Sequence, residues 1–504
     1  MLSMNRRSFL KISGLTGLAW VGDLTFLSKL RPVSAAEAKL PSRLVQLHPE
    51  IEPLVKLLED SPRDKVLEEV AARIRKGLSY QQILAALLLA GVRNIQPRPV
   101  GFKFHAVLVV NSAHLASLAS PDQDRWLPIF WAIDAFKNSQ AADVREGDWA
   151  MGAVDESAIP SSHTARQAFI EAMDNWDEPA ADAAIVGLAR TAPAHEIFEI
   201  LCRYGVRDFR EIGHKQIYLA NSFRTLEAIG WQHAEPVLRS LAYAMLDRDG
   251  SRENPAKSDL SPDRPYRRNL ELVKKINDSW RDGKADPDAT KQMLASIRDG
   301  SENDCADRVI ELLNRGVSTQ SIQDAIFDGA GELLMRAPGI LSLHATTFTN
   351  AVHYAFNRCR DDSTRKIMLL QNASFLPRFR GNSKDKGIHI DSMEPLAPEK
   401  PGAAAIEEIF ADMSKDKLSA AKKMLGYLKD GGDTRSLADA ARRLIFLKGR
   451  DSHDYKFSSA VLEDYAAMNP PWRDRYLAAS AFYLKGSGDK DNDLVKRIRA
   501  AVAG

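Results

Sequence analysis

Apolar residues recur at steps of three and four along most of this chain, which is the spacing of one face of an α-helix. The first such stretch comprises Leu44, Leu47, Ile51, Leu54, Leu57 and Leu58, and the next comprises Val66, Val70 and Ile74. Few stretches alternate with the period of two that is typical of a β-strand. Serines suited to open helices stand at Ser79, Ser162 and Ser318, and glycines suited to end them stand at Gly77, Gly205 and Gly316. The sequence therefore predicts an all-α fold.

One stretch of about forty residues occurs twice in the chain in similar form. It runs from Gly77 to Ala116 and again from Gly316, so that the two copies are offset by 239 residues. Only eleven of the forty aligned positions are identical, and two of these are histidines. The same offset continues through the later pairs Gly187 and Gly426, Arg203 and Arg442, and His214 and His453.

A period of this length indicates a duplicated domain rather than a short solenoid repeat. We therefore predict two similar helical lobes, related by a pseudo-twofold axis, over residues 40–248 and 268–504. Residues 249–267 contain three prolines among charged residues and are predicted to link the lobes. Residues 137–161 and 381–402 lack helical periodicity and are predicted to be long loops that could cover a site.

The N-terminus carries the most specific motif of the chain. The residues Asn5-Arg6-Arg7-Ser8-Phe9-Leu10-Lys11 precede an apolar run from Ile12 to Leu27, and small residues follow at Val33-Ser34-Ala35. This arrangement resembles a twin-arginine export signal. The resemblance implies a signal peptide over residues 1–35, cleaved near Ala35, with the twin-arginine export machinery as a partner. It also implies a periplasmic protein that is exported in its folded state.

Charge and hydropathy limit the possible partners. The full chain of 504 residues has a formal net charge of +2, and loss of the first 35 residues changes this to −2 because five cationic side chains and one acidic side chain leave. No excess of lysine and arginine is then present to neutralise phosphates, so nucleic acid is not an expected partner. The longest apolar run beyond the signal, Ile83 to Val92, is about half of the roughly 20 residues that a membrane span needs.

Histidines are the main candidates for chemistry. Six of the eleven form three pairs at the constant offset: His105 with His344, His114 with His353, and His214 with His453. Imidazole nitrogens suit iron, copper, zinc and nickel. We therefore expect the six to bind a transition metal, such as iron, copper or zinc, or a metal-bearing cofactor, in one site across the pseudo-twofold axis or in two sites.

The spacing of these residues constrains the site. His105 and His114 are nine residues apart, which on one helix places them about 180° apart, so we expect the helix to begin near His105. Asn111 precedes His114 by three residues and shares its helix face, as Asn350 does with His353. We expect both asparagines to orient a substrate or a bound oxygen species. The alternative is that a duplicated fold has kept structural histidines twice.

Other motifs are absent or weak. The cysteines Cys202, Cys305 and Cys359 are widely spaced and odd in number, which is typical of buried apolar residues rather than of a disulfide framework. His195 and Glu196 do not continue to the HExxH of a metalloprotease, and the chain contains no GxSxG, P-loop or GxGxxG motif.

Three segments resemble the questin-oxidase-like family. They are NSAHLASLASPDQDRWLPIFWAIDAF, IGHKQIYLANSFRTLEA and HATTFTNAVHYAF. The features that carry the resemblance are Asn111 with His114, the helix-opening His214, and His344 with Thr347. The resemblance implies a helical protein and an oxygen-dependent oxidation. The chain departs from the family in its export signal and in lacking a closely spaced double histidine.

The sequence as a whole predicts an exported oxidoreductase that depends on a metal or redox cofactor and acts on a small organic substrate through its paired histidines. The alternative is a non-catalytic periplasmic helical scaffold or ligand-binding protein. The two hypotheses differ in the placement of the histidines. A group that converges on a cavity favours chemistry, whereas dispersed and individually hydrogen-bonded rings favour a scaffold.

Overall fold

The amphipathic repeats form α-helices throughout residues 44–381 and 387–503, which are the residues that the computed structural model describes. The predicted twin-arginine signal peptide, with its cleavage point near Ala35, lies outside the described residues. From Val45 onward the chain forms one compact unit. Apart from an isolated bridge between Lys284 and Val317, the described residues contain no β pairing. The all-α prediction is confirmed.

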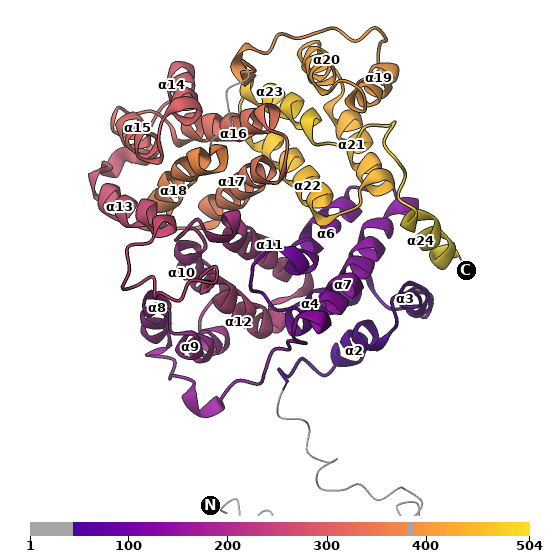
Figure 1. The fold of residues 1–504 in the computed structure, drawn as a ribbon, viewed down its shortest axis with the longest axis vertical. Coiled ribbons are helices and arrows are strands. Elements are labelled where there is room, and N and C mark those ends of the chain that lie inside the picture. Colours follow the sequence, from indigo (N-terminus) through magenta and orange to yellow (C-terminus); the bar gives the residue numbers. More distant parts are fainter. Residues whose placement is uncertain (1–43, 382–386, 504) are drawn as a thin grey trace, which may run out of the picture. The chain divides into compact units, whose positions relative to one another are not determined.

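In the first half of the chain, the residues that the structure describes form eleven α-helices, most of which are labelled in Figure 1. They are α2 (Glu52–Asp60), α3 (Val66–Arg75), α4 (Tyr80–Asn94), α5 (His105–Leu108), α6 (Val110–Leu118), α7 (Leu127–Glu146), α8 (Ala165–Asn175), α9 (Glu178–Thr191), α10 (Ala194–Gly205), α11 (His214–Ile229) and α12 (Ala234–Met245).

The second half continues the series. It contains α13 (Arg264–Leu272), α14 (Pro287–Asp299), α15 (Glu302–Asn314), α16 (Thr319–Arg336), α17 (Ile340–Arg358), α18 (Asp362–Arg380), α19 (Ala403–Met413), α20 (Lys417–Lys429), α21 (Thr434–Lys448), α22 (Ser452–Ala467), α23 (Trp472–Ala479) and α24 (Leu494–Ala503). Short 3-10 helices join these elements: η2 (Phe102–Phe104), η3 (Asp122–Asp124), η4 (Glu156–Ala158), η5 (Arg210–Gly213), η6 (Trp231–His233), η7 (Ser261–Asp263), η8 (Val273–Lys275), η9 (Asp278–Arg281), η10 (Ile390–Ser392) and η11 (Ser480–Phe482).

Helix positions recur at the offset seen in the sequence. Helices α4 and α16 begin 239 residues apart, as do α9 and α20. Ser79 and Ser318 cap α4 and α16 by accepting a hydrogen bond from the third backbone N–H of each helix. The amide of Gln81 in α4 donates to the carbonyl of Ala228 at 2.8 Å, and Gln320 in α16 donates to Ala467 at 3.0 Å. These recurring positions support the inferred duplication.

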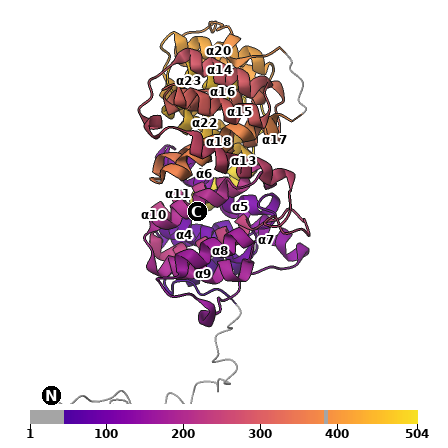
Figure 2. The same ribbon diagram turned by 90° about the vertical axis from the view of Figure 1, so that its left-hand side faces the viewer.

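Four helices form a ring at the centre of this unit. Helix α11 packs on α6 and α17, and α22 packs on the same two helices, so that α11 and α22 lie across the ring from each other. Figure 1 shows α6, α11, α17 and α22 grouped in the middle, with the other helices around them. In Figure 2 the ring lies where the indigo and magenta helices of the first half meet the orange and yellow helices of the second half. Each half of the chain therefore contributes two helices to one centre.

The predicted apolar core helix is α4, in which every residue from Ile83 to Arg93 is buried. Within the described ranges, none of the helices combines the length and the apolar character needed to cross a bilayer. The three cysteines are buried and free.

Two predicted segments differ from simple loops. Helix α7 extends to Glu146, so the predicted loop over residues 137–161 is helical in its first ten residues, where the exposed face of α7 is polar and hides the period. The predicted linker over residues 249–267 packs closely on the first half. Its Asp263 pairs with the guanidinium of Arg210 at 2.6 Å, and the carbonyl of Pro262 accepts from the backbone N–H of Phe209.

Candidate metal centre

Three histidines lie at or near helix starts and share one hydrogen-bonding pattern. His105 begins α5, His214 begins α11, and His344 lies in the second turn of α17. In each ring Nδ1 bonds a carbonyl oxygen about one turn earlier: at 2.8 Å for His105 and Phe102, at 2.7 Å for His214 and Glu211, and at 2.7 Å for His344 and Ile340. Because a carbonyl can only accept, each Nδ1 carries the proton. The neutral ring then presents an unprotonated Nε2.

The three Nε2 atoms converge. Nε2 of His214 lies 3.0 Å from Nε2 of His105 and 2.8 Å from Nε2 of His344, and all three nitrogens lie within 4.8 Å of one another. Unprotonated nitrogens at this separation repel each other unless a cation lies between them. Two nitrogens bound to one ion at about 2.0 to 2.1 Å in neighbouring positions are about 3 Å apart. These three histidines could therefore hold a metal ion.

A shared proton is a poorer explanation of the contact. The pKa of each of the three rings is held well below 6.5, chiefly by burial and further by the positive charge of Lys456 and of neighbouring imidazoles. Neutral imidazole is the form that binds metals. The group therefore favours a metal ion over protons at neutral pH.

His453, near the start of α22, completes a four-ring cluster. Its ring centroid lies 4.5 Å from that of His105 and 5.2 Å from that of His344. Nε2 of His453 is buried and has no hydrogen-bond partner among the described residues, while Nδ1 lies 3.4 Å from a carboxylate oxygen of Asp451. A carboxylate that orients a histidine in this way is typical of metal sites.

The spacings within the cluster follow the inferred pseudo-twofold axis. His105 and His214 are 4.8 Å apart by ring centroid, against 5.2 Å for the equivalent pair, His344 and His453. His105 and His453 are 4.5 Å apart, against 4.4 Å for their equivalents, His344 and His214. The histidines of both halves therefore form one group rather than two.

The four ring helices run away from the cluster in the same direction. Hydrogen bonds join residues that follow the clustered histidines along the chain, where α5, with His105, leads directly into α6: Asn221 to the carbonyl of Leu108 at 2.9 Å, Ser459 to the carbonyl of Ser112 at 3.3 Å, and Arg224 to Asn350 at 3.2 Å. The N-termini of these helices therefore face the cluster. Their partial positive charges add to the forces that keep the imidazoles neutral.

A cavity of about 840 Å³ opens beside the cluster and is lined by all four histidines. Phe102, Trp131, Ile212 and Ile340 contribute apolar walls. The volume lies in the range of pockets that hold small organic molecules.

Backbone strain is concentrated around this cavity. Four residues that line it have left-handed φ angles: Phe102 at 48°, Glu211 at 52°, Ile212 at 45° and Asp249 at 51°. Only two other non-glycine residues in the described part of the chain share this conformation. It is unfavourable for a β-branched residue such as Ile212, and such strain is typical of functional sites.

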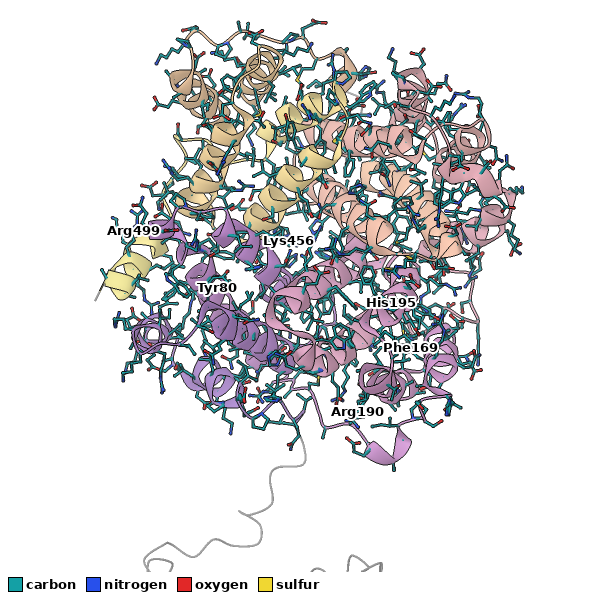
Figure 3. All side chains as sticks on the ribbon, turned by 180° about the vertical axis from the view of Figure 1, so that it is seen from behind. Tyr80, Phe169, Arg190, His195, Lys456 and Arg499 are labelled. Atoms are coloured by element: carbon teal, nitrogen blue, oxygen red, sulfur yellow. The ribbon has the colours of Figure 1, made fainter. Side chains whose placement is uncertain are left out.

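Lys456 lies in the interior of the ring, about one helical turn beyond His453 on α22. It is labelled in Figure 3, where α22 meets the helices of the first half. Its ammonium nitrogen is buried without a hydrogen-bond partner in the described structure, and burial lowers its pKa to about 7. The equivalent residue of the first half is the apolar Ile217. Lys456 was not among the residues expected at the site, although it follows His453 by three residues on the same helix face.

His114 and His353 are not part of this group. Nδ1 of His114 bonds the hydroxyl of Tyr80 at 2.9 Å, and Nε2 of His353 bonds the amide of Asn357 at 3.0 Å. Both follow the first histidine of their copy by nine residues, about two and a half helical turns, which carries them away from the cluster. Burial lowers the pKa of His353 to about 4.

Asn111 and Asn350 line a small space inside the ring, together with Lys456, and do not line the large cavity. Asn350 donates to Asp464 at 2.7 Å and to Glu463 at 2.9 Å. The Oδ1 atom of Asn111 is buried without a partner in the described residues. Neither asparagine therefore lies where the sequence analysis expected it to orient a substrate.

Several residues of the cavity were not anticipated. Glu211 precedes His214 by three residues, and burial together with the nearby Asp247 and Asp249 raises its pKa to about 7. Its place in the sequence could have pointed to it. Glu211 and Arg450 are related by the offset of 239 residues, and each precedes a paired histidine by three residues.

Comparison of the chain with protein-family models, with curated proteins and with solved structures finds no match.

Proposed function

We propose that this chain binds one transition-metal ion through Nε2 of His105, His214 and His344, and uses it to oxidise a small organic molecule in the adjoining cavity. The observation that carries the proposal is the contact between three unprotonated Nε2 atoms, two of the separations being 3.0 and 2.8 Å. Of the expected metals, iron or copper would supply redox chemistry, whereas zinc does not change its oxidation state. The resemblance to the questin-oxidase-like family favours dioxygen as the oxidant.

The protein's own groups would have distinct roles. The carbonyl oxygens of Phe102, Glu211 and Ile340 fix the tautomer and orientation of the three ligands. His453, with its Nδ1 facing Asp451 and its Nε2 unpartnered, would serve as a fourth ligand or move a proton at Nε2. The apolar walls would bind the substrate and exclude water.

We also propose that the protein reaches the periplasm through the twin-arginine pathway. The support is the paired Arg6 and Arg7 ahead of the apolar run. Export in the folded state would allow a metal to be inserted before the protein crosses the membrane.

The test is elemental analysis and absorption spectroscopy of protein purified from a bacterial host grown with iron, copper and zinc. We expect about one metal ion per chain, lost at least ten-fold in His105→Ala, His214→Ala and His344→Ala. Matched controls are His163→Ala and His195→Ala, since both side chains are exposed, and also His114→Ala. These three should keep the wild-type metal content.

Two results would count against the proposal. Wild-type protein that holds no metal after growth with all three metals would remove the metal centre. Stoichiometric zinc, with no redox-active metal bound under any loading condition, would remove the oxidation and favour a non-catalytic binding protein.

A further inference from the structure

Most charged side chains that line the cavity are neutralised within the protein. The guanidinium of Arg63 pairs with Asp134 at 2.7 Å, and the ammonium of Lys103 pairs with Asp143 and Glu146, each at 2.8 Å. Each of these charged groups therefore has an ion-pair partner within the protein.

Three charged groups of the cavity have no ion-pair partner in the described structure: Glu211, Asp249 and Arg450. Arg450 has only two weak contacts, at 3.5 Å, from its guanidinium to the carbonyls of Lys490 and Asp491. Unpaired charges that face a cavity are candidates for ligand recognition.

Glu211 and Arg450 are carried by segments that lead into opposite helices of the ring, α11 and α22. Glu211 is tied to His214, whose Nδ1 bonds its carbonyl, and Arg450 immediately precedes Asp451, which caps α22 and faces His453. Helices α11 and α22, which carry His214 and His453, are across the ring from each other. The offset of 239 residues also relates Glu211 to Arg450, so the pseudo-twofold axis pairs a negative group with a positive one.

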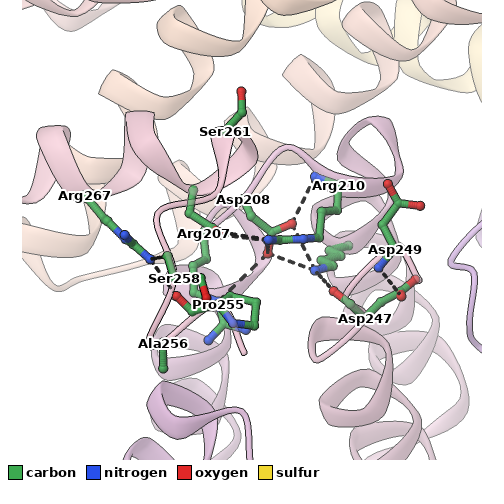
Figure 4. A network of polar contacts seen from close by, with 12 residues as sticks. Arg207, Asp208, Arg210, Asp247, Asp249, Pro255, Ala256, Ser258, Ser261 and Arg267 are labelled. Atoms are coloured by element: carbon green, nitrogen blue, oxygen red, sulfur yellow. Dashed lines mark hydrogen bonds and ion pairs between the residues drawn. The ribbon is translucent and has the colours of Figure 1, made fainter. Parts of the chain in front are cut away.

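A polar network lies beside the acidic groups. Figure 4 shows the part of it in which Asp247 accepts from the backbone N–H of Asp249. In the same network Asp208 binds the ammonium of Lys215 at 2.9 Å. Arg210 is directed to Asp263 at 2.6 Å. The nearby Lys215 and Arg210 therefore pair with Asp208 and Asp263. Neither cation forms an ion pair with Glu211 or Asp249.

We propose that the cavity binds a zwitterion, a small molecule with a protonated amine at one end and an anionic group at the other. The carboxylates of Glu211 and Asp249 would bind the amine, and the guanidinium of Arg450 would bind the anion. The body of the molecule would lie across the histidine cluster against Phe102, Ile212 and Ile340. This inference rests on the proposed use of the cavity as a substrate site.

The test is calorimetric titration of the full metal-loaded protein with ω-amino carboxylates, from 3-aminopropanoate to 8-aminooctanoate. The titrations are run at pH 8. We expect one chain length to bind at least ten-fold more tightly than the alkylamine or the alkyl carboxylate of the same length. The matching ω-aminoalkyl phosphonates distinguish a carboxylate from a phosphate-like anion as the preferred group.

Two variants locate the ends of the ligand. Glu211→Gln should weaken the zwitterion and the alkylamine about ten-fold and leave the alkyl carboxylate unchanged, and Arg450→Gln should do the reverse. Arg499→Gln, a change at an exposed arginine of α24 that does not line the cavity, is the control. Circular dichroism checks that each variant is folded.

Affinities that are the same in both variants and in the control would overturn the zwitterion inference. Metal content measured on the same samples keeps this result separate from the proposed function. If the protein holds metal but its affinity for the zwitterion does not depend on Glu211 or Arg450, only the zwitterion inference is contradicted. If the protein holds no metal but binds the zwitterion through Glu211 and Arg450, only the proposed metal centre is contradicted.

Discussion

Two buried lysines of this protein have opposite surroundings. Lys215 lies 3.0 and 2.9 Å from the two carboxylate oxygens of Asp208 and 2.9 Å from the carbonyl of Asp247. Lys456 is equally inaccessible and has no hydrogen-bond partner in the described structure. A buried charge stabilises a fold only when it is paired, so the two residues should contribute to stability with opposite signs.

Replacing each lysine by methionine tests this contrast in metal-free protein. We expect Lys456→Met to raise the free energy of unfolding at pH 6 by about 2 to 4 kcal/mol. We expect Lys215→Met to lower it by about 3 to 5 kcal/mol, since Asp208 loses its closest partner. The measurement is urea unfolding followed by circular dichroism, and a loss of stability in Lys456→Met would contradict the assignment of an unpaired ammonium.

The effect of Lys456→Met should depend on pH. In the folded protein the pKa of Lys456 is about 7, and in the unfolded chain it is near 10.5. Below pH 7 both states are protonated and the full cost of the buried charge is present. Between pH 7 and 10.5 only the unfolded chain binds the proton, so wild-type stability rises with pH and the advantage of the variant shrinks.

At the scale of elements, the start of α11 depends on a glycine. Gly213 has a φ angle of 84°, and a Cβ at this position would come within 2.6 Å of Phe348. Gly316, at the same φ angle of 84°, has nothing within 4 Å of such a Cβ. The two glycines therefore separate the cost of the backbone conformation from the cost of crowding.

Alanine at each position measures the difference. Gly316→Ala should destabilise the protein by about 1 kcal/mol through the left-handed backbone alone, without loss of metal. Gly213→Ala should cost about 2 to 4 kcal/mol, and it should lower the metal content because the clash with Phe348 displaces the neighbouring His214. Equal stability and equal metal content in the two variants would show that the Gly213 segment does not position the ligand.

At the scale of the whole molecule, the buried histidines should make the metal-free fold sensitive to acid. The folded pKa of His353 is about 4, against 6.5 in the unfolded chain, and the pKa of the three clustered histidines is also well below 6.5. As the pH falls from 6.5 toward 4, the unfolded chain binds protons that the folded chain does not. Stability should therefore be complete above pH 6.5 and decline below it.

Urea titrations of metal-free protein between pH 7 and pH 4.5 measure this decline. His353→Gln should reduce the total loss by up to about 3 kcal/mol, since one fewer proton is taken up on unfolding. His195→Gln, in which the replaced ring is exposed, should leave the slope unchanged. Parallel curves for all three proteins would show that His353 already binds a proton in the fold.

The fold class could be predicted because helical periodicity is local. Ser79 and Ser318 cap the predicted helices, and a helix begins at His105 as expected, although His114, whose spacing motivated that expectation, lies outside the cluster. The polar end of α7 was misassigned because a helix that exposes most of its surface has no apolar stripe to reveal it.

The site was predictable only in part. Four of the six paired histidines meet in one cluster, and the pairing at a constant offset selected them from the eleven in the chain. Spacing along the chain separates these four from His114 and His353, because nine residues, about two and a half helical turns, carry the second histidine of each copy away from the shared centre. Glu211 and Lys456 were missed because their residue types are common, and their three-residue spacing from a histidine becomes informative only once His214 and His453 are known to share a cluster.

The sequence by itself determined that this chain is helical and which histidines are paired, because periodicity, capping and internal repetition depend on neighbours along the chain. Only the tertiary structure decided that histidines from both halves form one group, since that depends on how α6, α11, α17 and α22 pack across several hundred residues. The same packing buries Lys456 and brings Glu211 and Arg450 to one cavity. Burial and long-range proximity create these properties, and neither is a property of a residue's neighbours in sequence.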